Sequence, residues 1–126
     1  LTAVSTWSNA DDGVDAFEHG AGNFDFEAMG SSSYWNGDRG FELTQSEGSG
    51  DLTAGFENVS IIANGSDGIN GLDDNAGGLS FSLTGCTILF NGEDAVDLTA
   101  QDAAGTFAPG GSTVIGDVEL QNVVIV

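Results

Sequence analysis

The chain has 126 residues, about the length of one domain, and carries 20 acidic residues but a single basic one, Arg39, for a formal net charge of −19. Nucleic-acid partners and anionic membrane surfaces are excluded, because both are bound by clustered basic residues. Hydrophobic residues make up 40% of the chain and recur periodically, which argues against disorder, and no apolar run approaches the roughly 20 residues of a membrane span.

An asparagine returns along the chain in steps of 27, 28 and 27 residues. Its neighbours repeat as well, as the segments Ser60–Gly65 and Thr87–Gly92 illustrate. A period of this length indicates a stack of similar layers, each buried only by its neighbours. We expect tight turns at these positions and a ladder of side-chain amides between the layers. The four ladder residues are Asn9, Asn36, Asn64 and Asn91.

Three short strands are predicted in each layer, because apolar residues alternate in three separate stretches. One stretch precedes the asparagine, as in Val59–Ile61, and another follows it, as in Phe41–Leu43. The remaining stretch lies before the next repeat, as in Leu79–Leu83. Strands of successive layers would pair in parallel about 4.8 Å apart, which describes a three-sided parallel β-helix.

The end of the chain departs from this period. Val123 aligns with Cys86 at a step of 37 residues, and we expect the surplus, residues 99–116, to form a surface loop. Residues 1–126 then form one β-helix domain that begins and ends in the same strand column. Open ends of a β-helix expose unpaired backbone, so we expect a segment of a longer solenoid, or units that stack end to end.

Segments such as Cys86–Leu98 resemble the repeats of right-handed parallel β-helices of the pectate-lyase-like type, and the resemblance covers nearly the whole chain. It implies an all-β, right-handed parallel β-helix of about four turns of 27–28 residues, with three short strands per turn and inward asparagines. It implies little about function, because this fold hosts lyases, epimerases, phage tailspikes, adhesins and purely structural segments.

Acidic residues form columns three and six positions after the asparagines. The only basic residue, Arg39, falls in the first column, and we expect it to bridge Asp12 and Asp67. Carboxylates grouped in this way are candidate ligands for Ca²⁺, which prefers oxygen; the alternative is a solvated acidic face. The candidate Ca²⁺ ligands are Asp11, Asp12 and Asp15 in the first layer and Glu93, Asp94 and Asp97 in the fourth.

An apolar stripe is predicted two residues before the asparagines, on the outer surface. Such a stripe suggests a partner surface, either a neighbouring subunit or sugar rings stacked on its aromatic members; the alternative is that a bulge or the 99–116 loop covers it. We expect Trp35 and Phe90, next to the stripe, to point inward. The binding stripe consists of Trp7, Tyr34, Ile62 and Leu89.

Catalytic groupings are sparse in this sequence. Arg39 is flanked by carboxylates, the lone His19 lies in a turn, and Cys86 has no nearby base. The sequence therefore predicts a non-catalytic segment of an extracellular or surface fibre, filament, adhesin or virus appendage, stabilised by Ca²⁺.

Two alternatives stay open: the scaffold of a polysaccharide lyase or epimerase, and a carbohydrate-binding module. The expected partners are further copies, neighbouring parts of the same longer chain, or a glycan, without nucleic acid or membrane insertion. The expected location is extracellular, at a cell or virion surface.

Overall fold

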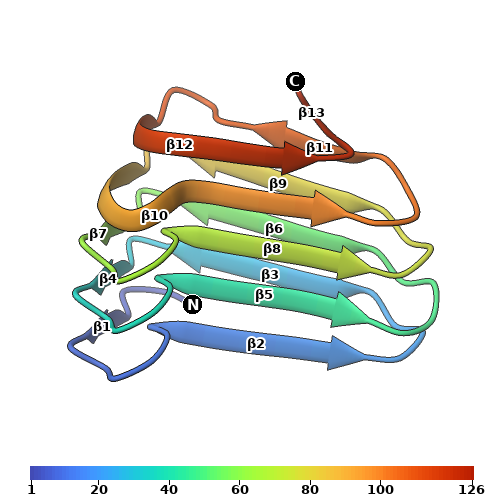
Figure 1. The fold of residues 1–126 in the computed structure, drawn as a ribbon, viewed down its shortest axis with the longest axis horizontal. Helices are drawn as coiled ribbons and strands as arrows, with labels where there is room; N and C mark the ends of the chain where they lie inside the picture. The colour runs from blue at the N-terminus through green and yellow to red at the C-terminus, as the bar shows by residue number, and fades with distance from the viewer.

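The computed structural model describes all residues, 1–126, as stacked coils of β-strand (Figure 1). Each coil contributes to three strand columns. The first column holds β1 (Ser5–Trp7), β4 (Ser32–Tyr34) and β7 (Ser60–Ile62), the second holds β2 (Val14–His19), β5 (Phe41–Ser46) and β8 (Ile69–Asp74), and the third holds β3 (Phe24–Met29), β6 (Leu52–Glu57), β9 (Leu79–Thr84), β11 (Gly105–Ala108) and β13 (Val123–Ile125). Two longer strands, β10 (Thr87–Ala100) and β12 (Thr113–Gln121), run through both the first and the second column.

Every strand pairing in the stack is parallel and places equivalent residues of successive coils side by side. Ser5, Ser32, Ser60 and Thr87, for example, are consecutive partners along the first column. The predicted all-β parallel β-helix of about four turns is thereby confirmed. The structure contains no helix that is long and apolar enough to cross a membrane.

The interior is filled by the inward residues of all three columns, and phenylalanines dominate its centre. The rings of Phe41 and Phe56 meet edge to face with centroids 5.1 Å apart, and Phe26 and Phe81 extend this contact on either side. Gly71 makes room for the cluster, because a Cβ at that position would lie 2.5 Å from the ring of Phe81. The inward apolar side chains of successive coils are therefore closely packed against one another.

A left-handed backbone residue stands at the corner before each asparagine. Ser8, Trp35, Ala63 and Phe90 have φ values of 54°, 52°, 58° and 58°. A residue in this conformation interrupts the strand alternation, so its side chain points outward like that of the residue before it. The expectation that Trp35 and Phe90 point inward is wrong for this reason: they are 64% and 72% exposed.

The asparagine side chains that follow these corners form one continuous hydrogen-bonded column. The Oδ1 of Asn36 accepts from both the backbone N–H and the Nδ2 of Asn9, at 3.3 and 2.9 Å. The Oδ1 of Asn64 accepts in the same way from Asn36, at 3.2 and 2.8 Å, and that of Asn91 from Asn64, at 3.1 and 3.0 Å. Each amide thus fixes the next coil at the corner.

The prediction that residues 99–116 form a surface loop is wrong. Strand β11 lies within this range and pairs with β9 and β13, and β12 begins at Thr113 as the partner of Thr87. The alignment of Val123 with Cys86 is wrong because the last coil is shorter at its corner. Four residues separate Leu89 from Asp94 in β10, whereas Gly116 alone separates their partners Ile115 and Asp117 in β12. Val123 accordingly pairs with Gly105 and is not the counterpart of Cys86.

Both ends of the chain lie in one column, as expected, but it is the third column and not the one that precedes the asparagines. Residues 1–3 run beside the end of β3, where the amide of Ala3 donates to Met29 O at 3.0 Å, before β1 begins. The last strand, β13, belongs to the third column.

Replacing Asn64 by alanine is expected to destabilise the fold strongly. The substitution leaves the buried backbone N–H of Asn36 without an acceptor, and it removes one acceptor of the Asn36 Nδ2 and one of the two donors to the Oδ1 of Asn91. These losses cost about 2–5 kcal/mol in the free energy of unfolding. The matched control is Asn9→Ala, whose side chain is exposed and donates one bond, with an expected cost of about 1 kcal/mol or less. Urea denaturation measures both values, and equal losses would contradict a cooperative ladder.

Candidate functional site

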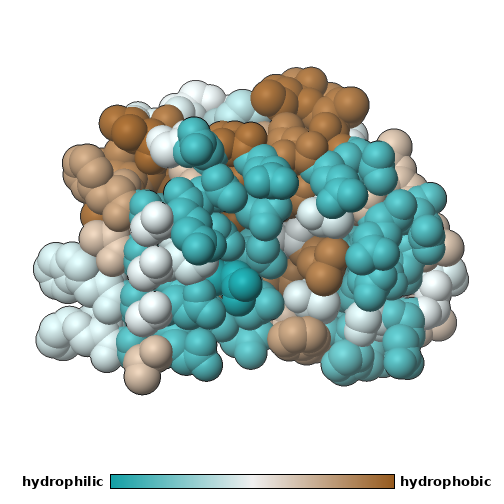
Figure 2. All heavy atoms as spheres, viewed as in Figure 1, coloured by the Kyte–Doolittle hydropathy of each residue, from teal (hydrophilic) through white to brown (hydrophobic).

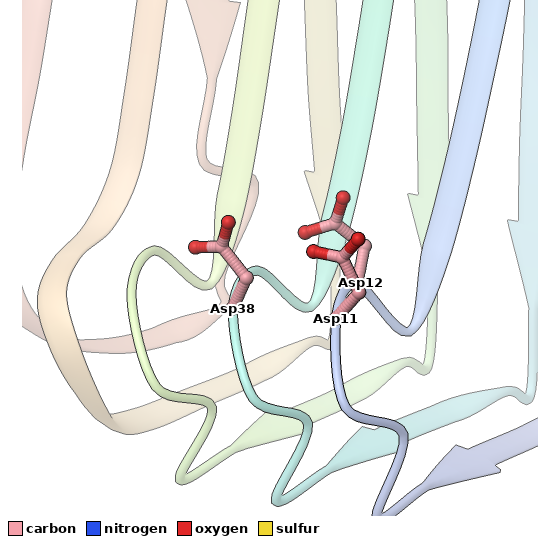
Figure 3. Close-up of side chains that lie close together, drawn as sticks. All are labelled: Asp11, Asp12 and Asp38. Atoms are coloured by element: carbon pink, nitrogen blue, oxygen red, sulfur yellow. The ribbon is translucent and has the colours of Figure 1, made fainter.

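One group of three carboxylates converges at the corner between the first and second columns. The carboxylate oxygens of Asp11, Asp12 and Asp38 lie within 4.8 Å of one another, on the turns that lead into β2 and β5 (Figure 3). Asp38 occupies in the second coil the position that Asp11 occupies in the first, and stacking brings the two together. Carboxylates at this spacing suit a hard cation such as Ca²⁺.

The predicted ligand Asp15 does not join this group, because it lies on β2 opposite Glu42. Its place is taken by Asp38, which the sequence analysis missed. The signal was present in the repeat, since Asp11 and Asp38 both lie two residues after an asparagine.

Arg39 neutralises the acidic corner from the second coil. Its guanidinium lies 3.0 Å from Glu42, 3.5 Å from Asp38 and 3.5 Å from the nearly buried Asp67. We expected the Arg39 side chain to bridge Asp12 and Asp67, but Asp12 contacts the backbone instead: its Oδ1 accepts a hydrogen bond from the N–H of Arg39 at 2.8 Å. A single cation therefore serves three carboxylates, which accounts for its place in the middle of the acidic column.

The other predicted ligands, Glu93, Asp94 and Asp97, do not converge on one point. Glu93 accepts a hydrogen bond from Ser66 at 2.9 Å, and Asp97 accepts one from Asn70 at 3.0 Å. They remain part of a larger acidic surface, because β12 adds further carboxylates next to them in register. These additional residues are Asp117, opposite Asp94, and Glu119, opposite Asp97.

Burial raises the pKa of both Asp94 and Asp97, and the neighbouring carboxylates of Asp67 and Glu119 raise both further. Asp117 also raises the pKa of Asp94. For Asp97 the hydrogen bond from Asn70 offsets part of the shift. Sequence reasoning missed the contribution of β12, because it assigned the start of this strand to a loop.

The binding stripe forms on the first column, where Trp7, Tyr34, Ile62 and Leu89 are consecutive partners. Trp7 is 65% exposed, and the other three side chains are half-buried. The outward-pointing Trp35 adds a second indole beside Tyr34, with ring centroids 6.2 Å apart. Neither a bulge nor the 99–116 segment covers the aromatic end of the stripe.

The groups considered for catalysis lie apart from one another. His19 stacks on Phe17 at 5.6 Å between centroids, and its Nδ1 lies 2.6 Å from Ser46 Oγ at an exposed site. Cys86 is buried, and its thiol donates to the backbone carbonyl of Phe56 at 3.3 Å. The Ser46–His19 contact arises from register, since both residues end their strands in adjacent coils.

Comparison of the chain with protein-family models, with curated proteins and with solved structures gives no match.

The raised pKa values predict that stability falls as pH rises. Asp94 and Asp97 bind their protons more tightly in the folded chain than at the ordinary aspartate pKa of 3.8. The stability they contribute is fully present below pH 3.8 and is lost as pH rises through their folded-state pKa values. We expect the urea midpoint, measured with a chelator, to fall as the pH rises above 3.8 and through the folded-state pKa values of these groups. Asp97→Asn should flatten this dependence, and a rising midpoint would contradict the prediction.

Proposed function

We propose that this chain is a non-catalytic structural β-helix segment of an extracellular or surface fibre, filament, adhesin or virus appendage. The observation that carries the proposal is the unbroken in-register stack, in which the amide ladder from Asn9 to Asn91 joins four coils. A stack held by coil-to-coil bonds transmits load along its axis, as a fibre element requires.

The unpaired edges support further stacking on this axis. Strands β1 and β2 each have a single partner strand, so their outer edges offer free backbone groups. The Oδ1 of Asn9 accepts no bond, because each ladder oxygen accepts only from the preceding coil. We propose that another β-helix coil, from a second copy or from a neighbouring part of the same longer chain, pairs with this end.

The opposite end of the stack differs in character. Figure 2 shows apolar side chains gathered over β12 and β13, whereas the face of β5, β8 and β10 is mostly hydrophilic. An exposed apolar surface of this kind favours burial against a partner. The residues responsible are Ile115, Val118, Val124, Ile125 and Val126.

The charge and the corner carboxylates support an extracellular setting. A net charge of −19 repels like units, and extracellular salt and Ca²⁺ reduce that repulsion. We propose that Ca²⁺ bound by Asp11, Asp12 and Asp38 stabilises the stack. We also propose that the fold belongs to the right-handed, pectate-lyase-like type, as the inward asparagine column supports.

Electron microscopy and sedimentation of the purified protein, with Ca²⁺ and with a chelator, test the stacking. We expect elongated particles that grow with protein concentration. Ile125→Asp, at the apolar end, should shorten them, whereas the control Phe90→Asp, also exposed but on the side of the stack, should not. Dispersed short particles under both conditions would refute end-to-end stacking. Cleavage of acidic polysaccharides that disappears in Arg39→Ala would refute a non-catalytic role.

A second candidate function, glycan binding, is favoured by one observation: Trp7 and Trp35 expose indole rings on adjacent coils, at 65% and 64%. Pyranose rings stack on such faces, and the acidity of the chain favours neutral sugars over anionic ones. We expect Trp7→Ala to weaken binding of a neutral polysaccharide about tenfold and Phe90→Ala to leave it unchanged. Calorimetric titration measures the affinity of both variants for the polysaccharide. Equal affinities would exclude the binding stripe as the glycan-binding site.

A further inference from the structure

A column of polar side chains points into the core nine residues after each asparagine. Glu18, Gln45 and Asp73 are consecutive partners on β2, β5 and β8, and Ala100 on β10 completes the column. In each strand the two preceding inward positions are occupied by core residues such as Phe41 and Leu43. The strand alternation thus delivers three polar groups to one interior corner of neighbouring coils.

The oxygen atoms of this column are buried and lack hydrogen-bond donors. Gln45 and Asp73 are both 0% exposed. Neither carboxylate oxygen of Asp73 has a partner, and the same holds for Oε1 of Gln45 and the buried Oε2 of Glu18. Four buried acceptors on three successive coils therefore lack a hydrogen-bond donor. In folded proteins nearly all buried polar atoms have a hydrogen-bond partner.

The glutamine amide is fixed in an orientation that leaves its oxygen free. Nε2 of Gln45 donates to the backbone carbonyl of Gly22 at 2.6 Å. Glycine at position 50 allows this close approach, since a Cβ there would lie 1.8 Å from the same carbonyl oxygen and 2.4 Å from Nε2 of Gln45. Oε1 is then the end of the amide that remains for another ligand.

The local charge also calls for a cation. Burial raises the pKa of Asp73, and the carboxylates of Asp51, Asp74 and Asp102 raise it further, while the nearby N–H of Asn75 lowers it in part without reaching hydrogen-bond geometry. The only basic side chain, Arg39, is committed to Asp38, Glu42 and Asp67. A buried carboxylate without a pairing residue is costly unless a metal or a proton neutralises it.

We propose that Asp73, Gln45 and Glu18 form an internal binding site for a hard divalent cation of the Ca²⁺ class. The donor set is all oxygen, one amide and two carboxylates, which is the set that Ca²⁺ takes in proteins, with backbone carbonyls and water completing its shell. This site is separate from the surface group of Asp11, Asp12 and Asp38, and it does not depend on the proposed stacking function. A cation here ties three coils together from inside.

Calcium titration of the chelator-treated protein tests the site by calorimetry and thermal unfolding. We expect Ca²⁺ to raise the melting temperature of the wild type. Asp73→Asn should weaken the interior binding by on the order of tenfold or more, because it removes one ligand charge. The matched control is Asp74→Asn, the same substitution at the exposed neighbouring residue, and a second control, Asp12→Asn, disrupts the surface group. Asp74→Asn should keep the full Ca²⁺-dependent shift in melting temperature, whereas Asp12→Asn should lose only the part of the shift that the surface group contributes.

A further variant keeps the test independent of the folding of Asp73→Asn. Gln45→Glu adds a carboxylate to the same corner and should tighten Ca²⁺ binding while lowering stability in chelator. The proposal is overturned if Ca²⁺ shifts Asp73→Asn as much as the wild type, or if only Asp12→Asn abolishes the shift. It is also overturned if Asp73→Asn is more stable than the wild type at neutral pH with saturating Ca²⁺, since a protonated carboxyl or a bridging water then occupies the corner.

Discussion

The structure depends on one constraint, the in-register stacking of each residue on its equivalents in the neighbouring coils. A column of amides gains from this arrangement, because each oxygen beyond the first coil finds a donor one coil away. A column of carboxylates loses, because like charges are held at the spacing of paired strands. The positions of Arg39 and Asn70 follow from this, since each places a donor where a carboxylate would meet another.

The fold could be predicted from the sequence because its periodicity reports this stacking directly. The asparagine spacing and the alternating apolar triplets define coils, columns and the inward face, and the observed register agrees with them. The outward direction of Trp7 and Tyr34 in the first column was also predictable, because both residues follow the same alternation. Wherever a residue repeats in every coil, its environment repeats as well.

What could not be predicted lies where the repeat breaks or where backbone geometry overrides alternation. The left-handed residue before each asparagine turns Trp35 outward, and nothing in a period-2 pattern identifies that corner. The shortened last coil moved the strand pairing by several residues, which concealed Asp117 and Glu119. The interior acceptors of Gln45 and Asp73 escaped notice because polar residues at the end of a strand ordinarily suggest a turn.

The asparagine column has a direction, and this limits the symmetry of anything built upon it. Every ladder oxygen faces the first coil and every donor faces the last. The strands of each column also share one direction, so two units that continue the parallel pairing must point the same way, since opposed units would bring their edge strands together antiparallel. An array of this kind has no two-fold axis across its junctions, so its two tips are chemically distinct and growth at one of them differs from growth at the other.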